Sequence, residues 1–157
     1  MEKKIELKRA SADNVDELTA ICVRAFHSDH ILPDYPGPEP SGPPGYNSSE
    51  WHADIMKKSY YFGLYCEEKL IGGAIVFKER FNICFLGQIY IDPVYQGKGC
   101  GGDVMKALFR QFPEAVSWKL ETPVWNIRTR AFYKKCGFQE VSVKGDSVWF
   151  EKKRQDL

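Results

Sequence analysis

Four glycines fall within the seven residues QGKGCGG, which run from Gln96 to Gly102. The apolar run NICFLGQIYI precedes this stretch, and residues 101–112 follow it with the spacing of an amphipathic helix. Glycine has no side chain to block a ligand, so a strand, a glycine-rich loop and a helix in this order bring backbone close to a bound group. Backbone N–H groups at the start of a helix bind anions. The segment therefore predicts a phosphate site.

Two familiar phosphate loops fit this segment poorly. The P-loop requires G-x-x-x-x-G-K-[ST], a spacing that the chain lacks. Gly97, Gly99 and Gly102 do satisfy the dinucleotide pattern G-x-G-x-x-G, and Glu121 stands about where a ribose-binding acid is expected. However, DPVYQ separates the glycines from the strand, and only 55 residues follow Gly102, too few for the remaining units of a dinucleotide fold.

Apolar periodicity elsewhere predicts a mixed α/β domain. Strands are expected at 4–10, 60–66, 70–78, 82–91, 116–122, 138–144 and 147–153. Helices are expected at 13–26, from a Ser48 or Ser49 cap to about 58, at 101–112 and at 127–136. Several of the gaps between strands have hairpin length, so much of the sheet should be antiparallel.

Length and composition limit the function classes. A chain of 157 residues, 43% of them hydrophobic, fits one domain over 1–157. A net charge of +1 gives no electrostatic case for nucleic acid or an anionic membrane. The amino terminus lacks the apolar centre of a signal peptide, no run is long enough to span a bilayer, and the five cysteines suggest reduced thiols. We therefore expect a cytoplasmic protein. The chain is compatible with a homodimer.

The segment at about 27–48 has an unusual composition. Six of the nine prolines lie between Pro33 and Pro44, with glycines among them, which predicts a stiffened loop. Residues 25–56 contain five acids and no lysine or arginine, so this segment carries a charge of −5. A solvated acidic loop and an acidic binding wall remain alternative interpretations.

Two stretches resemble the signatures of the GNAT superfamily of N-acetyltransferases. In that family a strand and Asp-Pro precede Gln/Arg-x-x-Gly-x-Gly/Ala at the start of a helix. Here IYIDPVYQGKGCG places Gln96, Gly99 and Gly101 in register. The second signature is an asparagine followed seven residues later by the tyrosine of Y-x-x-x-G-F. Here NIRTRAFYKKCGF places Asn126 and Tyr133 in register. The order of elements is also similar over nearly the whole chain.

The resemblance implies a single GNAT-like domain, with a mixed, mostly antiparallel sheet, splayed central strands and flanking helices. It also implies acetyl-CoA as cofactor, with its pyrophosphate on the glycine loop and its pantetheine arm between the splayed strands. The residues that it assigns to cofactor binding are Ile89, Tyr90, Ile91, Gln96, Gly97, Lys98, Gly99, Cys100, Gly101, Gly102, Asn126 and Tyr133. On the strand only backbone groups are expected to bind, while the side chains pack in the core.

Other readings stay open for some of these residues. Asn126 is expected to be a helix cap, a cofactor contact or both. Cys100 is expected to fill space in the core rather than act as a nucleophile. Lys98 and, further off, a group of cations are candidates for the remaining phosphate charge: Arg128, Arg130, Lys134 and Lys135.

The resemblance makes Tyr133 the candidate general acid. A phenol with a pKa near 10 is a weak proton donor to a thiolate of about 8.5, so hydrogen bonding to the sulfur is expected to be most of its role. Packing alone is the alternative. The sequence does not identify the general base. Gln88 occupies a position where some relatives carry an acid, and His27, His30 and His52 are each candidates, although surface histidines are expected more often. A metal site is not expected.

The acceptor is expected on the side of the acidic segment, which follows the first helix. The candidate acceptor-binding residues are Asp29, His30, Asp34, Glu50, Trp51 and Gln88. An acidic wall attracts a cation and aromatic rings pack its carbon skeleton, so a small cationic amine is the expected acceptor. The alternative function is a non-catalytic acyl-CoA binding or sensor module of the same fold. Tyr133 favours the enzyme, and the missing acid at Gln88 leaves the alternative open.

Overall fold

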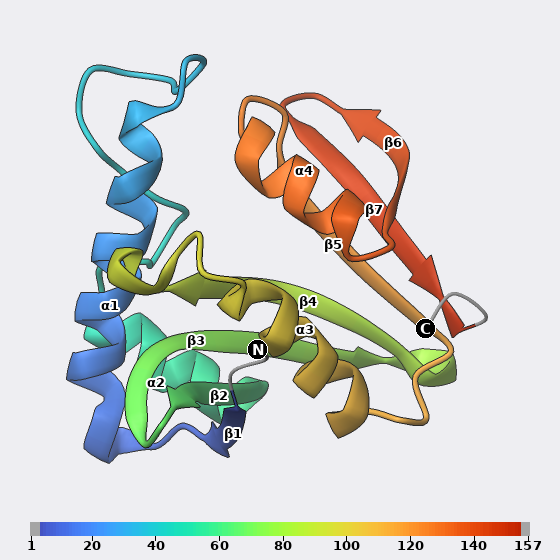
Figure 1. Cartoon of the computed structure of the whole chain (residues 1–157), viewed down its shortest axis with the longest axis horizontal. Helices are drawn as coiled ribbons and strands as arrows, with labels where there is room; N and C mark the ends of the chain where they lie inside the picture. The colour runs from blue at the N-terminus through green and yellow to red at the C-terminus, as the bar shows by residue number, and fades with distance from the viewer. Residues whose placement is uncertain (1–3, 155–157) are drawn as a thin grey trace.

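A single sheet of seven strands organises the described part of the chain, residues 4–154 of the computed structural model (Figure 1). The strands lie side by side in the order β1 (Ile5–Arg9), β2 (Tyr60–Cys66), β3 (Lys69–Glu79), β4 (Ile83–Ile91), β5 (Ser117–Pro123), β7 (Ser147–Lys153) and β6 (Gln139–Lys144). All neighbouring pairs are antiparallel except β4 and β5. The expectation of a mixed, mostly antiparallel sheet is confirmed.

The two central strands separate along their length. β4 pairs with β5 only where Ile83–Phe85 meets Ser117–Lys119. Beyond that point β4 continues to Ile91 and β5 to Pro123 without pairing with each other, and Figure 1 shows them diverging. The expected splay is therefore present. It leaves one edge of β4 without a strand partner.

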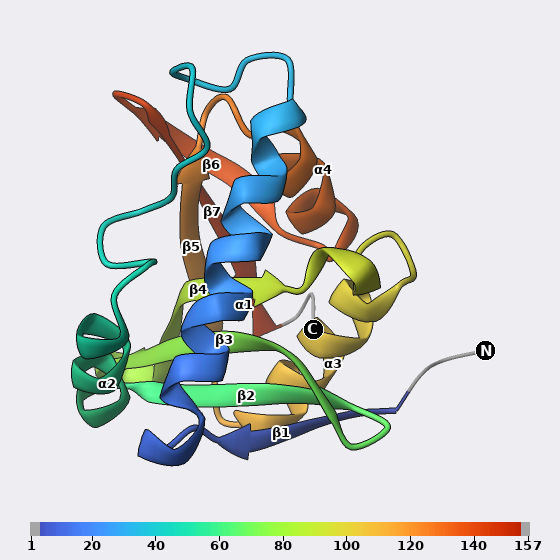
Figure 2. The same ribbon diagram turned by 90° about the vertical axis from the view of Figure 1, so that its left-hand side faces the viewer.

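Helices cover both faces of the sheet. α1 (Val15–His27) and α2 (Ser49–Lys58) lie on one face, whereas α3 (Cys100–Gln111) and α4 (Ile127–Lys135) lie on the other (Figure 2). The short helices η1 (Ala12–Asn14), η2 (Ser28–Ile31), η3 (Arg80–Asn82) and η4 (Pro93–Tyr95) lie in the connections. Ser48 caps α2 by accepting from the Trp51 N–H, which decides between the two expected caps.

Each face of the sheet has its own hydrophobic core. The larger core, under α3 and α4, includes Leu64, Val104, Leu108, Trp118 and Phe150. The smaller core, under α1 and α2, consists of Leu18, Ile21, Cys22, Ala25, Tyr61, Ile75 and Tyr90, with partly buried neighbours. All five cysteines lie within residues 4–154 outside disulfide bonds, and four of them are buried.

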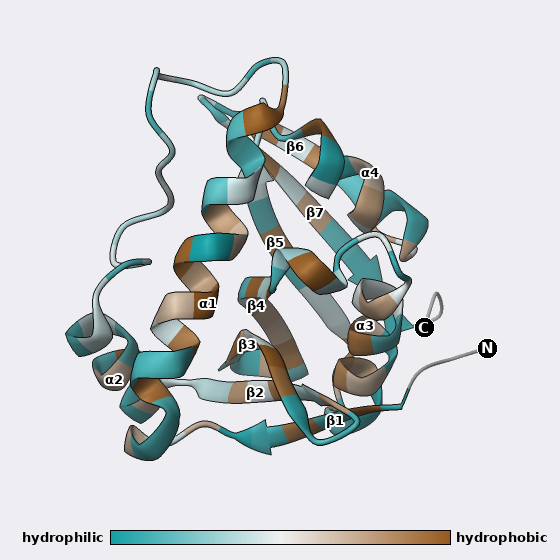
Figure 3. Ribbon diagram, turned by 60° about the vertical axis from the view of Figure 1, so that its left-hand side comes forward, coloured by the Kyte–Doolittle hydropathy of each residue, from teal (hydrophilic) through white to brown (hydrophobic). Residues whose placement is uncertain are grey.

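The proline-rich segment between η2 and α2 has no helix or strand over residues 32–48. Figure 3 shows it as mostly white to teal, which agrees with a loop that contributes little to either core. It is nevertheless tied to the rest of the molecule. The ring of Tyr35 meets Trp125, which follows β5, edge to face at 4.9 Å between centroids. The loop therefore reaches across to the far side of the splay.

Candidate active site

The glycine loop is fixed to the end of β4 by side chains close to it in the sequence. Asp92 accepts from the Val94 N–H and starts η4. Gln96 donates its amide to the Ile91 carbonyl at 2.9 Å, so the loop turns back onto the last residue of β4. Gly97 and Gly99 then take φ values of +75° and +81°, in the left-handed region that other residues adopt at a cost.

The start of α3 presents backbone to solvent. No side chain caps this helix, whose N-cap is Gly99. The first N–H groups of any helix lack partners within it, and α3 has twelve residues to build a dipole. A Cβ added at Gly97, Gly99 or Gly102 would point into open space. An anionic group needs N–H donors without partners and open space beside them, and the start of α3 offers both.

Contacts at Gly101 bring the two sequence signatures together. A Cβ at Gly101 would lie 2.8 Å from Phe132 Cε1, so glycine is needed here for α4 to pack against the start of α3. Cys100 turns into the larger core, which also contains Tyr133 and against which Ile89 and Ile91 pack. The Cys100 thiol is buried, as expected for a space-filling residue.

The Tyr133 ring is largely buried among aromatic neighbours. Its ring packs on Phe132, Phe138 and Phe150, at centroid distances of 5.2, 5.8 and 6.0 Å. Burial raises the pKa of Tyr133 well above that of a free phenol, so the hydroxyl keeps its proton. Within residues 4–154 this hydroxyl makes no hydrogen bond, which leaves the donor available.

Asn126 is engaged from both ends of its amide. Its Oδ1 accepts from the Thr129 N–H at 3.1 Å, which confirms the helix cap. Its Nδ2 donates to Asp29 Oδ2 at 3.2 Å, across the splay. The same carboxylate accepts from Arg128 at 2.5 Å, and Arg128 also donates to the Ser28 hydroxyl. Asp29 therefore joins η2 to the start of α4.

This arrangement includes contacts that the sequence did not predict. Asp29 is buried and paired with Arg128. Burial raises the pKa of Asp29, while Arg128 and Asn126 oppose that rise. Residues 97 or more positions apart come together here, which no local pattern shows. The assignments of Asp29 to the acceptor and of Arg128 to phosphate charge stay predictions.

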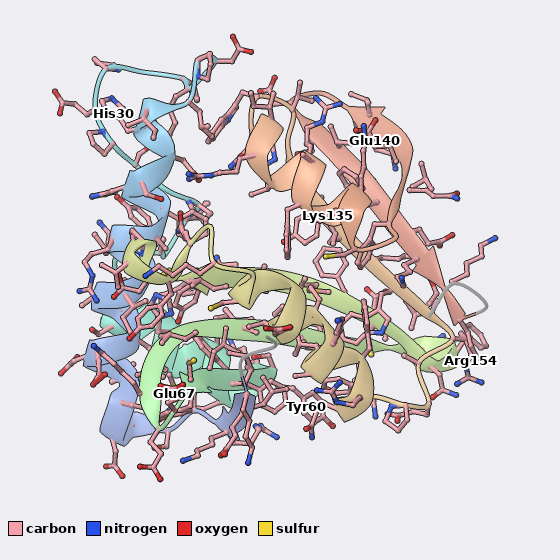
Figure 4. All side chains as sticks on the ribbon, viewed as in Figure 1. His30, Tyr60, Glu67, Lys135, Glu140 and Arg154 are labelled. Atoms are coloured by element: carbon pink, nitrogen blue, oxygen red, sulfur yellow. The ribbon has the colours of Figure 1, made fainter. Side chains whose placement is uncertain are left out.

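The remaining cations divide into paired and unpaired groups. Arg130 and Lys134 both pair with Glu140 of β6, at 2.9 and 3.2 Å, so they too are committed within the domain. Figure 4 labels Glu140 beside α4, and Lys135 on that helix. Lys98 is exposed in the glycine loop itself. It is thus the best-placed of the predicted cations to meet charge there.

The expected acceptor residues lie on several elements. Gln88 is half-buried on β4 and faces α1, where Cys22 Sγ lies 4.0 Å from Gln88 Oε1. His30 lies at the end of η2 with its Nε2 2.9 Å from the Pro38 carbonyl (Figure 4). Asp34 and Glu50 are exposed, on the loop and on α2.

The aromatic side chains of this region already have partners within the protein. The Trp51 ring fills the space beside Gly45, where a Cβ would lie 2.3 Å from Trp51 Cγ. Tyr46 stacks edge to face on Phe26 at 6.2 Å. The structure thus gathers these rings next to the end of α1 without forming an open aromatic cage.

His52 is not a surface residue. It is completely buried, with Nδ1 2.7 Å from the Tyr61 hydroxyl and Nε2 2.9 Å from the Tyr46 carbonyl. A proton could not reach solvent from this ring without opening the core, so His52 is removed from the candidate bases. Tyr61 and Tyr46 were not predicted from the sequence to be partners of His52. The only available signal was the placement of His52 within an apolar helical pattern.

The described elements can therefore offer two chemical features. One is a set of uncapped backbone donors at the start of α3. The other is the protonated phenol of Tyr133 on α4, the helix that packs against the start of α3 through Phe132. None of the helices within residues 4–154 has the length and apolarity that crossing a bilayer requires.

Comparison with known proteins identifies the family. The sequence model of the acetyltransferase (GNAT) family matches residues 25–138. The spermine/spermidine N(1)-acetyltransferase of Bacillus subtilis is 32% identical over 108 residues, which are 59% of this chain and 71% of that enzyme. YrkN of the same organism, an uncharacterised protein, is 37% identical over 75 residues, or 46% of this chain. That match spans only 40% of YrkN.

Solved structures share the fold at low sequence identity. The PaiA N-acetyltransferase of Thermoplasma acidophilum, crystallised with coenzyme A, has a TM-score of 0.79 at 18% identity, covering 96% of this chain and 99% of that one. The aminoglycoside acetyltransferase AAC(6')-Ib, also with coenzyme A, has a TM-score of 0.74 at 16% identity, covering 98% and 96%. The family match covers most of the chain, so this protein belongs to the GNAT family of acetyltransferases.

Proposed function

We propose that this protein transfers an acetyl group from acetyl-CoA directly to a primary amine, and that the amine is small and cationic. The observation that carries the proposal is the uncapped start of α3 beside the splay of β4 and β5. Membership of an acetyltransferase family supports the reaction class, and the resemblance to a spermine/spermidine acetyltransferase supports the kind of acceptor.

The residues present fit coenzyme A. A pyrophosphate needs backbone donors and space, and both exist at residues 97–102, where three of the four glycines face open room. The exposed Lys98 adds a cation. Coenzyme A would supply an acetyl group activated as a thioester. We assign the loop to its phosphates, and the unpaired edge of β4 at Ile89–Ile91 to its pantetheine arm.

The role of Tyr133 follows from its surroundings. Its raised pKa makes full proton transfer to a departing thiolate unfavourable, but a protonated phenol without a partner donates a hydrogen bond readily. We therefore assign Tyr133 to stabilising the negative charge on the leaving sulfur. The protein contributes this donor on a helix that is packed against the cofactor loop through Phe132 and Gly101.

We assign Asp29 a smaller part in attracting a cationic acceptor than the sequence predicted. That carboxylate is neutralised by Arg128, so the remaining negative charge of this segment lies on Asp34, Glu39, Glu50 and Asp54. Of these, Asp54 pairs with Lys58 on the surface. The attraction is therefore long-range and sensitive to screening, and the Michaelis constant of the acceptor should rise with salt.

A panel of amine acceptors tests the proposal. The purified protein is incubated with acetyl-CoA and polyamines, amino acids, aminoglycosides or peptides, and products are read by mass spectrometry. Acetylation of polyamines ahead of neutral and anionic amines is the expected result. Tight binding of coenzyme A with no acetylated product from any class would favour the alternative, a non-catalytic acyl-CoA binding module. A best acceptor that is neutral or anionic would reject the cationic assignment.

A further inference from the structure

The side chain of Tyr90 lies across the neighbouring strand of the sheet. It lies on β4 in the splayed part, opposite Gly73 of β3. A Cβ at Gly73 would lie 2.3 Å from the Tyr90 hydroxyl, and a Cβ at Gly72 would lie 2.1 Å from the Tyr90 carbonyl oxygen. Gly73 therefore leaves room for the ring to lie over β3, on the face that α1 and α2 cover, and Gly72 leaves room for the backbone of Tyr90.

At the far side of β3 the ring joins a buried polar chain. The Tyr90 hydroxyl lies 2.5 Å from that of Tyr61 on β2. The Tyr61 hydroxyl lies 2.7 Å from His52 Nδ1 on α2, and His52 Nε2 lies 2.9 Å from the Tyr46 carbonyl. The three side chains are 3%, 1% and 0% exposed. None of them has a role in the proposed transfer.

The chain has a single direction of donation. A carbonyl can only accept, so His52 Nε2 carries the proton and donates to Tyr46. In a neutral imidazole Nδ1 then accepts, which makes Tyr61 its donor and Tyr90 the donor to Tyr61. Burial lowers the pKa of His52 and raises the pKa of Tyr61 and Tyr90, so these protonation states are the stable ones.

The far end of the chain reaches the acceptor side. Tyr46, whose carbonyl accepts from His52, places its own hydroxyl 2.8 Å from His27 Nε2, at the last residue of α1. Five elements are therefore linked in order: β4, β2, α2, the loop and α1. Buried polar groups are tolerated only when each is satisfied, and a satisfied network holds its members in one arrangement.

We propose that Tyr90, Tyr61 and His52 are positioning residues, which hold the splayed end of β4 in register with Tyr46 and the end of α1. This inference rests on the proposed function, because it makes acceptor binding and turnover depend on side chains that touch neither substrate, whereas the part assigned to Tyr90 in cofactor binding is that of its backbone. Cofactor binding through the glycine loop should not depend on them, because that loop is held to the end of β4 by hydrogen bonds of Asp92 and Gln96 in which these three side chains take no part.

Tyr90→Phe and Tyr61→Phe test the proposal with rings retained. Tyr65→Phe is the matched control, since Tyr65 lies on the same strand as Tyr61 and accepts a hydrogen bond from Asn14 Nδ2 outside this chain. Each variant loses a buried hydrogen bond that holds the end of β4, so we expect kcat/KM for the acceptor to fall about tenfold in each test variant. Coenzyme A affinity by calorimetry should stay within about twofold of the parent.

A measurement without catalysis keeps the inference separate from the proposed function. Hydrogen exchange by mass spectrometry should be faster in Tyr90→Phe, both at 86–91 and at 45–52, and unchanged in Tyr65→Phe. That result would support the linkage even if no amine were acetylated. Exchange that changed at only one of the two segments would overturn it. So would Tyr90→Phe and Tyr61→Phe proteins that lose stability but keep parental acceptor kinetics.

Discussion

The two sides of the splay are built in different ways. On the cofactor side (η4, residues 96–99 and α3), the turn of the glycine loop is fixed by near neighbours in sequence, such as Gln96 to Ile91, five residues apart. Two distant contacts add to them, Arg24 with Asp92 and Phe132 with Gly101. On the acceptor side (the end of α1, η2, the loop at 32–48 and α2), contacts join distant residues, such as Asp29 to Arg128, 99 apart. The first side relies on backbone conformation and the second on side-chain pairing. Local sequence therefore reveals the first far better than the second.

The largest effect is expected from removing the hydroxyl of Tyr133 on α4, which we propose acts on the sulfur of the cofactor. Tyr133→Phe should lower turnover by about 10²–10⁴, because a donor to the leaving sulfur is lost. Coenzyme A affinity and thermal stability should hardly change, since the ring contacts remain and the hydroxyl has no partner within residues 4–154. Steady-state kinetics, calorimetry and thermal unfolding measure the three quantities. Parental turnover, with chemistry shown to be rate-limiting, would reduce Tyr133 to a packing residue.

A second test of the comparison is to block the anion site that the backbone forms at the start of α3. Gly102→Glu adds a side chain into open space at a residue without positive φ, whereas a change at Gly101 would also strike Phe132. Like charges about 4 Å apart near a surface repel by about 4 kcal/mol, so coenzyme A should bind at least about 100-fold more weakly.

The same substitution should not harm the fold. An acid in the first turn of α3 favours the helix by about 0.3–1 kcal/mol. Gly102→Ala is the control for bulk without charge, and it should bind coenzyme A more tightly than Gly102→Glu does. Calorimetry gives the affinities and thermal unfolding the stability. Tight binding by Gly102→Glu would show that the phosphates lie elsewhere.

What could be predicted follows this same division. The elements of the fold were predicted closely because each rests on local periodicity or a local cap, such as Ser48 for α2 and Gly137, with φ +98°, after α4. The glycine loop could be predicted from the sequence for the same reason. The partners of Asp29, His52 and Tyr90 were not, because they depend on which strands and helices become neighbours in the folded chain. A count of charges along the sequence could not show that Asp29 pairs with Arg128.

A smaller effect is expected from breaking the ion pair between Asp29 and Arg128, which joins the two sides of the separated strands. Arg128→Met leaves the nearly buried Asp29 carboxylate with only Asn126, whereas Asp29→Asn leaves a guanidinium that still reaches water. The first change should therefore destabilise more than the second, by about 1–3 kcal/mol against about 1 kcal/mol. Denaturant unfolding of both single variants and of the double variant measures this. Equal losses would mean that Asp29 is better solvated than the structure indicates.

The smallest expected effect is a pH dependence located on the acceptor side. His52 is buried against Tyr61, Trp51, the Tyr90 ring and the Tyr46 carbonyl, all uncharged, and burial lowers its pKa below the usual 6.5. The unfolded chain therefore binds a proton more readily than the folded one. It follows that stability is full above about pH 6.5 and declines as the pH falls below it.

One proton limits the slope of that decline to about 1.4 kcal/mol per pH unit. Unfolding free energies between pH 5 and 8 for the parent and for His52→Gln, a variant that cannot titrate at this position, isolate the contribution. His30→Gln, in η2 and outside both cores, is the control for replacing a histidine by glutamine elsewhere in the protein. The His52→Gln protein should be less stable throughout but flatter in this range. If the slopes of parent and His52→Gln coincide, His52 is not the neutral, buried acceptor of the Tyr61 proton, and the chain to Tyr90 loses its fixed direction.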